Sequence, residues 1–267
     1  MTRLTAILRK DLLDLRLNPW VILPAAIGGT IALVLPLVIA VIVPQVSGES
    51  LSESGELEMA VDIMRAQAGG AALDPETAIQ AWVFQQFLMF LILIPVLGAT
   101  SMAAHSVVGE KQARTLEPLL ATPITTFELL AGKALAALLP ALALTAIYFS
   151  IDLVLVAIFA RPGVLGALLG PRSLILVFVI GPLAALAALQ VAICVSSRVE
   201  DDRTAQGIGS FVALPVAMVF VAPLVGLQSV THLILGGLVA ALVIANVLLM
   251  RLSIAVFDRE SILTRWK

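Results

Sequence analysis

The chain has 267 residues, of which 60% are hydrophobic and only 13% are charged, and its formal net charge is −2. An average soluble domain is about half apolar and about one quarter charged, so this composition excludes an ordinary soluble protein. We predict an all-α integral membrane protein, a single transmembrane domain over residues 1–267, because its apolar stretches do not alternate as the strands of a membrane β-barrel do.

Six stretches are long and apolar enough to span a bilayer, which takes about 20 residues. They cover residues 20–44, 82–105, 130–160, 172–195, 207–227 and 232–251. Lys and Arg collect on the cytoplasmic side of membrane proteins. With the N-terminus inside, all but three of the 16 Lys and Arg residues fall in cytoplasmic segments, the exceptions being Arg65, Arg161 and Arg172. The sequence therefore predicts that both termini are cytoplasmic.

Residues 1–18 are predicted to form an amphipathic helix that lies in the inner membrane interface. Helical spacing places leucine and isoleucine side chains on one face and charged side chains towards the other. Asn18-Pro19 marks a break before the first span, because the residue before a proline disfavours helix. The alternative is a plain extension of that span.

Small residues recur at helical spacing in two of the predicted spans. The first span has Ala25 and Gly29, and the fifth has Gly209, Ala213 and Ala217, all at steps of four. Such ridges let a second helix approach closely. We therefore expect them to form the seam of a dimer.

The only long extracytoplasmic loop is predicted at residues 45–81. It holds seven acidic residues and one base, an excess typical of a solvated outer face, and it lacks the spacing of a calcium-binding loop. Asp74-Pro75-Glu76 has the N-cap, first-position proline and first-turn acid of a helix start. A helix that begins there would run through the second span to His105.

The third span carries a polar stripe. Thr145, Tyr148 and Asp152 lie three and then four positions apart. A carboxylate at the centre of a membrane helix costs about 2.5–3.5 kcal/mol, so this stripe should face protein or water. One interpretation is that the stripe lines a translocation route, for which Gln190 and Asn246 are further candidates. The alternative is an ion pair near the outer boundary between Asp152 and one of two arginines, Arg161 or Arg172.

The sequence contains no motif for catalysis, metal binding or nucleotide binding. A phosphate-binding loop around Gly132-Lys133 would need a glycine where Phe127 stands and Ser or Thr where Ala134 stands. His105 and His232 lie at opposite ends of spans without a second metal ligand at a useful spacing. We predict that the chain is not an enzyme and binds no cofactor itself.

The cytoplasmic segment 106–126 contains two helix starts. Thr115 is a plausible N-cap, and Pro118 lies in the first turn, where its missing N–H costs nothing. Leucines would give this short helix an apolar face. Thr125 and Glu128 then have the spacing of a capping box, which predicts that the next helix begins there. The alternative for this segment is a tight turn.

Residues 109–133, GEKQARTLEPLLATPITTFELLAGK, resemble the signature of type-2 ABC transporter permeases. The shared pattern is an acid, Thr-Leu-Glu, Leu-Leu, Thr-Pro, and a Gly-Lys that opens the next span. In that family a coupling helix between spans two and three docks in a groove of a cytoplasmic ATPase. The resemblance assigns ATPase coupling to Glu110, Arg114, Thr115, Leu116, Glu117, Leu119 and Leu120.

The resemblance implies the permease subunit of an ABC transporter, an exporter, in the cell (inner) membrane of a prokaryote. It implies two permease chains, as a homodimer or heterodimer, with two ATPase subunits that bind ATP and Mg²⁺; no nucleic acid is expected. Residues 207–254 leave little room for the outer half-helices that many members carry. The alternatives are an ATP-independent secondary carrier and a membrane anchor subunit.

Overall fold

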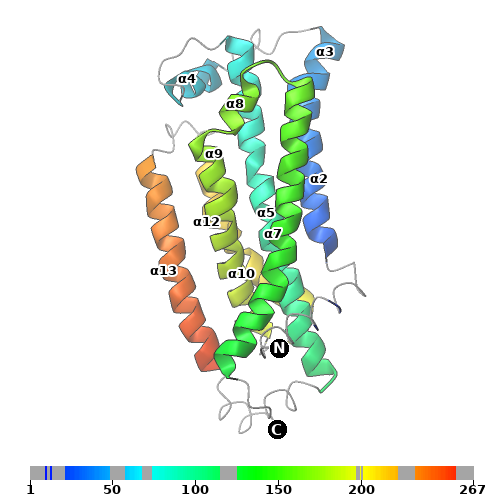
Figure 1. Ribbon diagram of the computed structural model, residues 1–267, viewed down its shortest axis with the longest axis vertical. Coiled ribbons are helices and arrows are strands. Elements are labelled where there is room, and N and C mark those ends of the chain that lie inside the picture. The colour runs from blue at the N-terminus through cyan, green and yellow to red at the C-terminus, as the bar shows by residue number, and fades with distance from the viewer. Residues whose placement is uncertain are drawn as a thin grey trace.

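The computed structural model describes residues 10, 13, 22–48, 58–67, 74–114, 125–196, 199, 201–221 and 232–256. All regular elements in these residues are helices. Five helical stretches are long and apolar enough to cross a membrane: Leu23–Ser47, Pro75–Glu110, Thr126–Phe159, Pro171–Ser196 and Ile234–Val256. They stand side by side as a bundle (Figure 1). The prediction of a multi-spanning helical protein is therefore confirmed.

The first span consists of α2 (Leu23–Leu37), the π-helical turn η2 (Val38–Ile42) and α3 (Val43–Ser47). Pro44 has no N–H, so the carbonyl of Ala40 cannot receive its usual helical hydrogen bond. The Nε2 atom of Gln80, on a different helix, donates to this carbonyl at 2.9 Å. The span ends at Gly48, whose φ of 72° is easily reached only by glycine.

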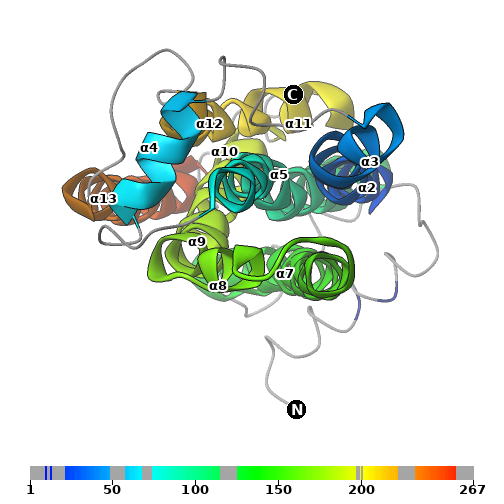
Figure 2. The ribbon, with the colours of Figure 1, turned by 90° about the horizontal axis from the view of Figure 1, so that it is seen from above.

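The helix α5 (Pro75–Gln112) is the central element of the bundle. Seen from above, it lies between α2, α7 and α10, all of which it contacts (Figure 2). It begins at Pro75 as predicted, and the Ala78 N–H donates to the Asp74 carbonyl at 2.9 Å. It continues through residues 106–112, which the sequence analysis placed in the cytoplasmic segment. The end of α5 is thus helical and held against its neighbours.

The helix α7 (Thr126–Phe159) begins with the predicted capping box. The Glu128 N–H donates to Thr125 Oγ1 at 3.1 Å, and the Thr125 N–H donates back to Glu128 Oε2 at 2.9 Å. These two bonds satisfy backbone donors that a helix start otherwise leaves unpaired. Beyond α7, the chain turns at Gly163 into α8 (Val164–Leu168).

The fourth span runs through α9 (Pro171–Ile175), η4 (Leu176–Ile180) and α10 (Gly181–Ser196), and the last is α13 (His232–Val256). The short α4 (Glu58–Gln67) lies across one end of the bundle (Figure 1). We call this the α4 end. The opposite end, where α5 ends and α7 begins, is called the coupling end.

The predicted fifth span is not one membrane-length helix in the described residues. It consists of α11 (Asp202–Ser210) and α12 (Ala213–Val221), and residues 222–231 lie outside the described part of the chain. Pro215 cannot donate to the Phe211 carbonyl, and the Leu214 N–H donates to it instead at 3.1 Å. The helix therefore breaks at Phe211. The described residues contain five helices of membrane-spanning length, and the sixth predicted span stays a prediction.

The start of α11 is capped by Asp201, which accepts from the Thr204 N–H at 3.0 Å. The hydrogen bond from the Thr204 hydroxyl, at 2.7 Å, holds the pKa of the Asp201 carboxyl below its usual range. This cap sets the position at which the chain re-enters the bundle.

Candidate functional site

The coupling end contains a buried cluster of charges. Glu110 on the last turns of α5 and Lys133 near the start of α7 are 6% and 3% exposed. Lys133 Nζ lies 2.8 Å from Glu110 Oε2 as an ion pair and donates a hydrogen bond to Ser106 Oγ at 2.6 Å. Lys10 forms a second ion pair with the other Glu110 oxygen. We call these four residues the Glu110 cluster.

The sequence places the members of the Glu110 cluster together by helical geometry. Ser106 and Glu110 are four positions apart, so they lie on one face of α5. Lys133 projects from α7, two turns after the capping box. Ions buried in low dielectric must be paired, and Glu110 has a cation on each side. The cluster thus ties α7 and Lys10 to the end of α5.

The two helices tied by this cluster also bound residues 113–125. At the start of that segment, Arg114 is exposed and has a φ of 55°, a left-handed conformation that is uncommon for a residue other than glycine. It lies two residues beyond the end of α5. At the other end, the capping box fixes Thr125 against α7. Both ends of the segment are therefore held in fixed positions.

The polar stripe of α7 faces the first span. Thr145 is buried and donates to the Ala141 carbonyl at 2.9 Å, within its own helix. The Tyr148 hydroxyl donates to the Ala26 carbonyl at 3.1 Å. Asp152 is only 3% exposed. Among the described residues it has no ion-pair partner, because Arg161 pairs with acids of α5 instead. The predicted pair between Asp152 and Arg161 is therefore wrong, and none forms with Arg172 in the described part of the chain.

We expect Asp152→Asn to leave the free energy of unfolding within about 1 kcal/mol of wild type, or to raise it. The substitution keeps the side-chain volume and removes a buried ionisable group that has no counter-ion among the described residues. Equilibrium unfolding in mixed micelles measures the change. A loss of several kcal/mol would show that the carboxylate has a counter-ion after all.

Gln190 and Asn246 form a separate polar contact between α10 and α13. The Nε2 atom of Gln190 donates to Asn246 Oδ1 at 3.4 Å, and Asn246 Nδ2 donates to the carbonyls of Leu183 and Leu242. No hydrogen bond among the described residues joins this pair to the stripe on α7. The described hydrogen bonds thus divide the five candidate route residues into two groups, and their role in a translocation route stays a prediction.

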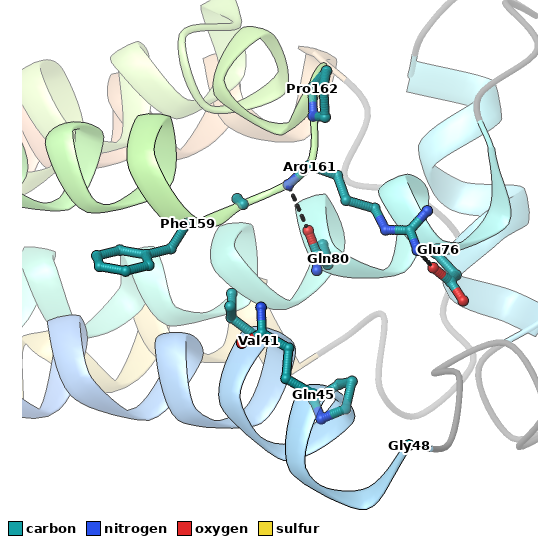
Figure 3. A pocket seen from close by; sticks show the side chains of 10 residues that line it. Val41, Gln45, Gly48, Glu76, Gln80, Phe159, Arg161 and Pro162 are labelled. Atoms are coloured by element: carbon teal, nitrogen blue, oxygen red, sulfur yellow. Dashed lines mark hydrogen bonds and ion pairs between the residues drawn. The ribbon is translucent and has the colours of Figure 1, made fainter.

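A recess of about 480 Å³ opens at the α4 end, where the first span, α5 and the end of α7 meet. Arg161 dominates its polar side. The guanidinium lies 3.1 Å from Asp74 Oδ2. It forms a second ion pair with Glu76, and the Arg161 N–H donates to Gln80 Oε1 at 3.0 Å (Figure 3). These contacts tie α7 to α5 at the end opposite the Glu110 cluster.

A family model described as ABC-2 family transporter protein matches residues 5–235, most of the chain. The chain belongs to the ABC-2 transporter family. It is the membrane permease subunit of an ABC transporter, a multi-pass protein that associates with an ABC ATPase subunit. Membership decides in favour of the permease over the carrier and anchor alternatives. No curated protein and no solved structure matches the chain.

The residues assigned to ATPase coupling in the ABC-2 permease fall into two sets. Arg114 is exposed, whereas the Glu110 carboxylate is buried and forms ion pairs with Lys133 and Lys10. The remaining five lie outside the described residues: Thr115, Leu116, Glu117, Leu119 and Leu120. Sequence reasoning overlooked Lys133 as a partner of Glu110, although a lysine inside an apolar helix is a signal for a buried ion pair.

The small residues predicted at the dimer seam of the permease are largely covered within one protomer. Ala25 is fully buried, and a Cβ on Gly29 would lie 2.6 Å from the Tyr148 ring. A Cβ on Gly209 would lie 2.9 Å from the Ala188 carbonyl oxygen. Ala213 is buried and Ala217 half-buried. These ridges serve packing inside the protomer, because their close neighbours are its own α5, α7 and α10.

Within the described residues, no group of three or more His, Cys, Asp and Glu side chains could hold a metal ion. Cys194 lies in α10 and contacts the Ser253 hydroxyl at 3.2 Å.

Proposed function

We propose that the permease is the membrane half of an exporter, and that a separate cytoplasmic ATPase docks on the segment that follows Arg114. The observation that carries this proposal is the Glu110 cluster, which ties the two helices bounding that segment. A force applied by the ATPase would act on α5 and α7 together, because neither helix end can move relative to the other without breaking a buried ion pair.

The two ties between α5 and α7 differ in strength. The Glu110–Lys133 pair is buried, and breaking such a pair by removing one partner costs about 3–5 kcal/mol. The Arg161–Asp74 pair is about half-exposed on both sides, and such pairs contribute about 0–1 kcal/mol. The Arg161–Asp74 ion pair should therefore resist separation less than the Glu110–Lys133 pair, while the hydrogen bond from the Arg161 N–H to buried Gln80 also joins the end of α7 to α5.

The remaining parts of the proposal follow the family. Two permease chains work with two ATPase subunits, which bind ATP and Mg²⁺ in place of any cofactor in this chain. The coupling end faces the cytoplasm, where the basic residues collect, and the membrane is the inner membrane of a prokaryote.

We expect Leu119→Asp to abolish co-purification of the ATPase subunit and ATP-dependent transport, while the permease itself remains folded. An aspartate in an apolar docking contact buries a charge without a partner. It should therefore weaken binding of the ATPase more than a change of side-chain shape does. Leu119→Met is the matched control, because it keeps volume and apolarity. Pull-down of the ATPase and its permease-dependent ATPase activity measure the effect. Wild-type values for Leu119→Asp would refute docking at this position.

A further inference from the structure

The recess at the α4 end has one polar side and one apolar side. Its lining includes the polar residues Arg161, Glu76 and Gln45 and the apolar residues Pro44 and Phe159. Figure 3 shows the Phe159 ring and the Arg161–Glu76 ion pair on opposite sides of the recess. Phe159 is 51% exposed and lines the recess. A ligand with one charged part and one apolar part would match both sides.

Buried hydrogen bonds hold the polar side of the recess in place. Gln80 is 8% exposed, and both ends of its amide are used, one by the Arg161 N–H and the other by the Ala40 carbonyl. The Ala40 carbonyl is available because Pro44 has no N–H. Gln80 thus fixes α7 and the first span to α5. The recess is a preformed part of the fold, and ligand binding would need little rearrangement.

The charges around the recess favour a ligand that carries a cation as well as an anion. Two carboxylates, Asp74 and Glu76, surround the single guanidinium of Arg161. A simple anion would approach a local excess of negative charge. However, a guanidinium has five N–H donors, and the two ion pairs leave some of them for a phosphate. The Glu76 carboxylate can pair at the same time with an ammonium group.

The apolar surface beside the recess suits an acyl chain. Val43 and Val46 on α3 and Ile158 on α7 are 50%, 82% and 66% exposed, next to the residues that line the recess. These helices are long enough to span a bilayer, so their exposed apolar side chains face lipid. A molecule with its headgroup in the recess would place its chains along them.

We propose that this recess binds the zwitterionic headgroup of a phospholipid-like amphiphile. Its phosphate lies beside Arg161, its ammonium group lies beside Glu76, and its acyl chains follow the exposed surfaces of α3 and α7. This site goes beyond the transport function proposed above, because it requires no ATPase. The test uses the purified permease alone and therefore fails or succeeds independently of ATPase docking.

The test is native mass spectrometry of the purified full chain in a nonionic detergent. Equimolar phosphatidylcholine and phosphatidylglycerol with identical acyl chains are added, and the bound lipid is identified. We expect retention of phosphatidylcholine in preference to phosphatidylglycerol. Equal retention of the two lipids, or preference for phosphatidylglycerol, would overturn the assignment of a zwitterionic headgroup.

Three variants localise the binding. Arg161→Gln should weaken retention of phosphatidylcholine about tenfold, because it removes a charge-assisted hydrogen bond. Gln45→Trp places a large side chain at the recess from an exposed position and should also reduce retention, without touching the ion pairs. Arg65→Gln, an exposed arginine on α4 that does not line the recess, should retain lipid as the wild type does. Wild-type retention by both Arg161→Gln and Gln45→Trp would refute the site.

Glycerophosphocholine distinguishes a lipid from a free headgroup, since it has the same charges and no acyl chains. We expect that it does not displace phosphatidylcholine at equal concentration, because the acyl chains contribute about 0.8 kcal/mol for each buried CH₂ group. Displacement by glycerophosphocholine at that concentration would assign the site to soluble headgroup compounds and overturn the lipid assignment.

Discussion

Replacing Lys133 by methionine is expected to lower the free energy of unfolding by about 3–5 kcal/mol, one of the two largest effects in this permease. Methionine matches the length of the apolar part of the lysine side chain but leaves Glu110 without its buried counter-ion. The remaining cation, Lys10, has a half-exposed side chain, so it cannot compensate for the charge inside the bundle. Equilibrium unfolding in mixed micelles, with helix content as the signal, measures the loss.

Two controls separate burial from charge in this experiment. Lys10→Met removes a cation from the same carboxylate, but the pair it breaks is partly solvated, so the loss should be about 0–1 kcal/mol. Glu110→Leu combined with Lys133→Met replaces the buried pair by apolar groups and should recover most of the stability. Similar losses for Lys10→Met and Lys133→Met would contradict the assignment of the buried pair as the main tie.

Features of the chain that depend on neighbours in sequence could be predicted. The capping box of α7 is formed by Thr125 and Glu128, three residues apart, and the start of α5 by Asp74 and Pro75. The existence of most spans follows from apolar length alone. These predictions hold because the interactions involved are complete within one or two helical turns.

Features that depend on which helices meet could not be predicted in the same way. Nothing in the spacing of Glu110 and Lys133 shows that α5 and α7 cross at that depth, or that Arg161 meets α5 before it can reach Asp152. The predicted fifth span is apolar enough to cross a bilayer, but hydropathy does not predict the helix break at Phe211. That break arises because Pro215 has no backbone N–H to donate to the Phe211 carbonyl. A ridge of small residues likewise shows that something packs closely there, without showing what.

The second large effect tests what covers the small residues of α11. A Cβ on Gly209 would lie 2.9 Å from the Ala188 carbonyl oxygen, 3.0 Å from Ala192 Cβ and 3.1 Å from Thr100 Cγ2. The contact with the Ala188 carbonyl oxygen involves backbone, which cannot move away by changing rotamer as a side chain can. Gly209→Ala should therefore destabilise the protomer by about 1–3 kcal/mol. Gly207, on the same helix, has open space around the corresponding position. Gly207→Ala should therefore stabilise by about 0.5–1 kcal/mol, because alanine is the better helix former.

The opposite signs expected for these two alanine variants distinguish packing within the protomer from packing between protomers. If Gly209 contacts α5 and α10 of its own chain, the loss is independent of protein concentration and appears in thermal unfolding of the isolated permease. If the glycine instead lies at a dimer seam, dilution should increase the loss, and crosslinking between the two copies of α11 should fall. The close contacts with Ala188, Ala192 and Thr100 favour the first result, since they already fill the space beside Gly209.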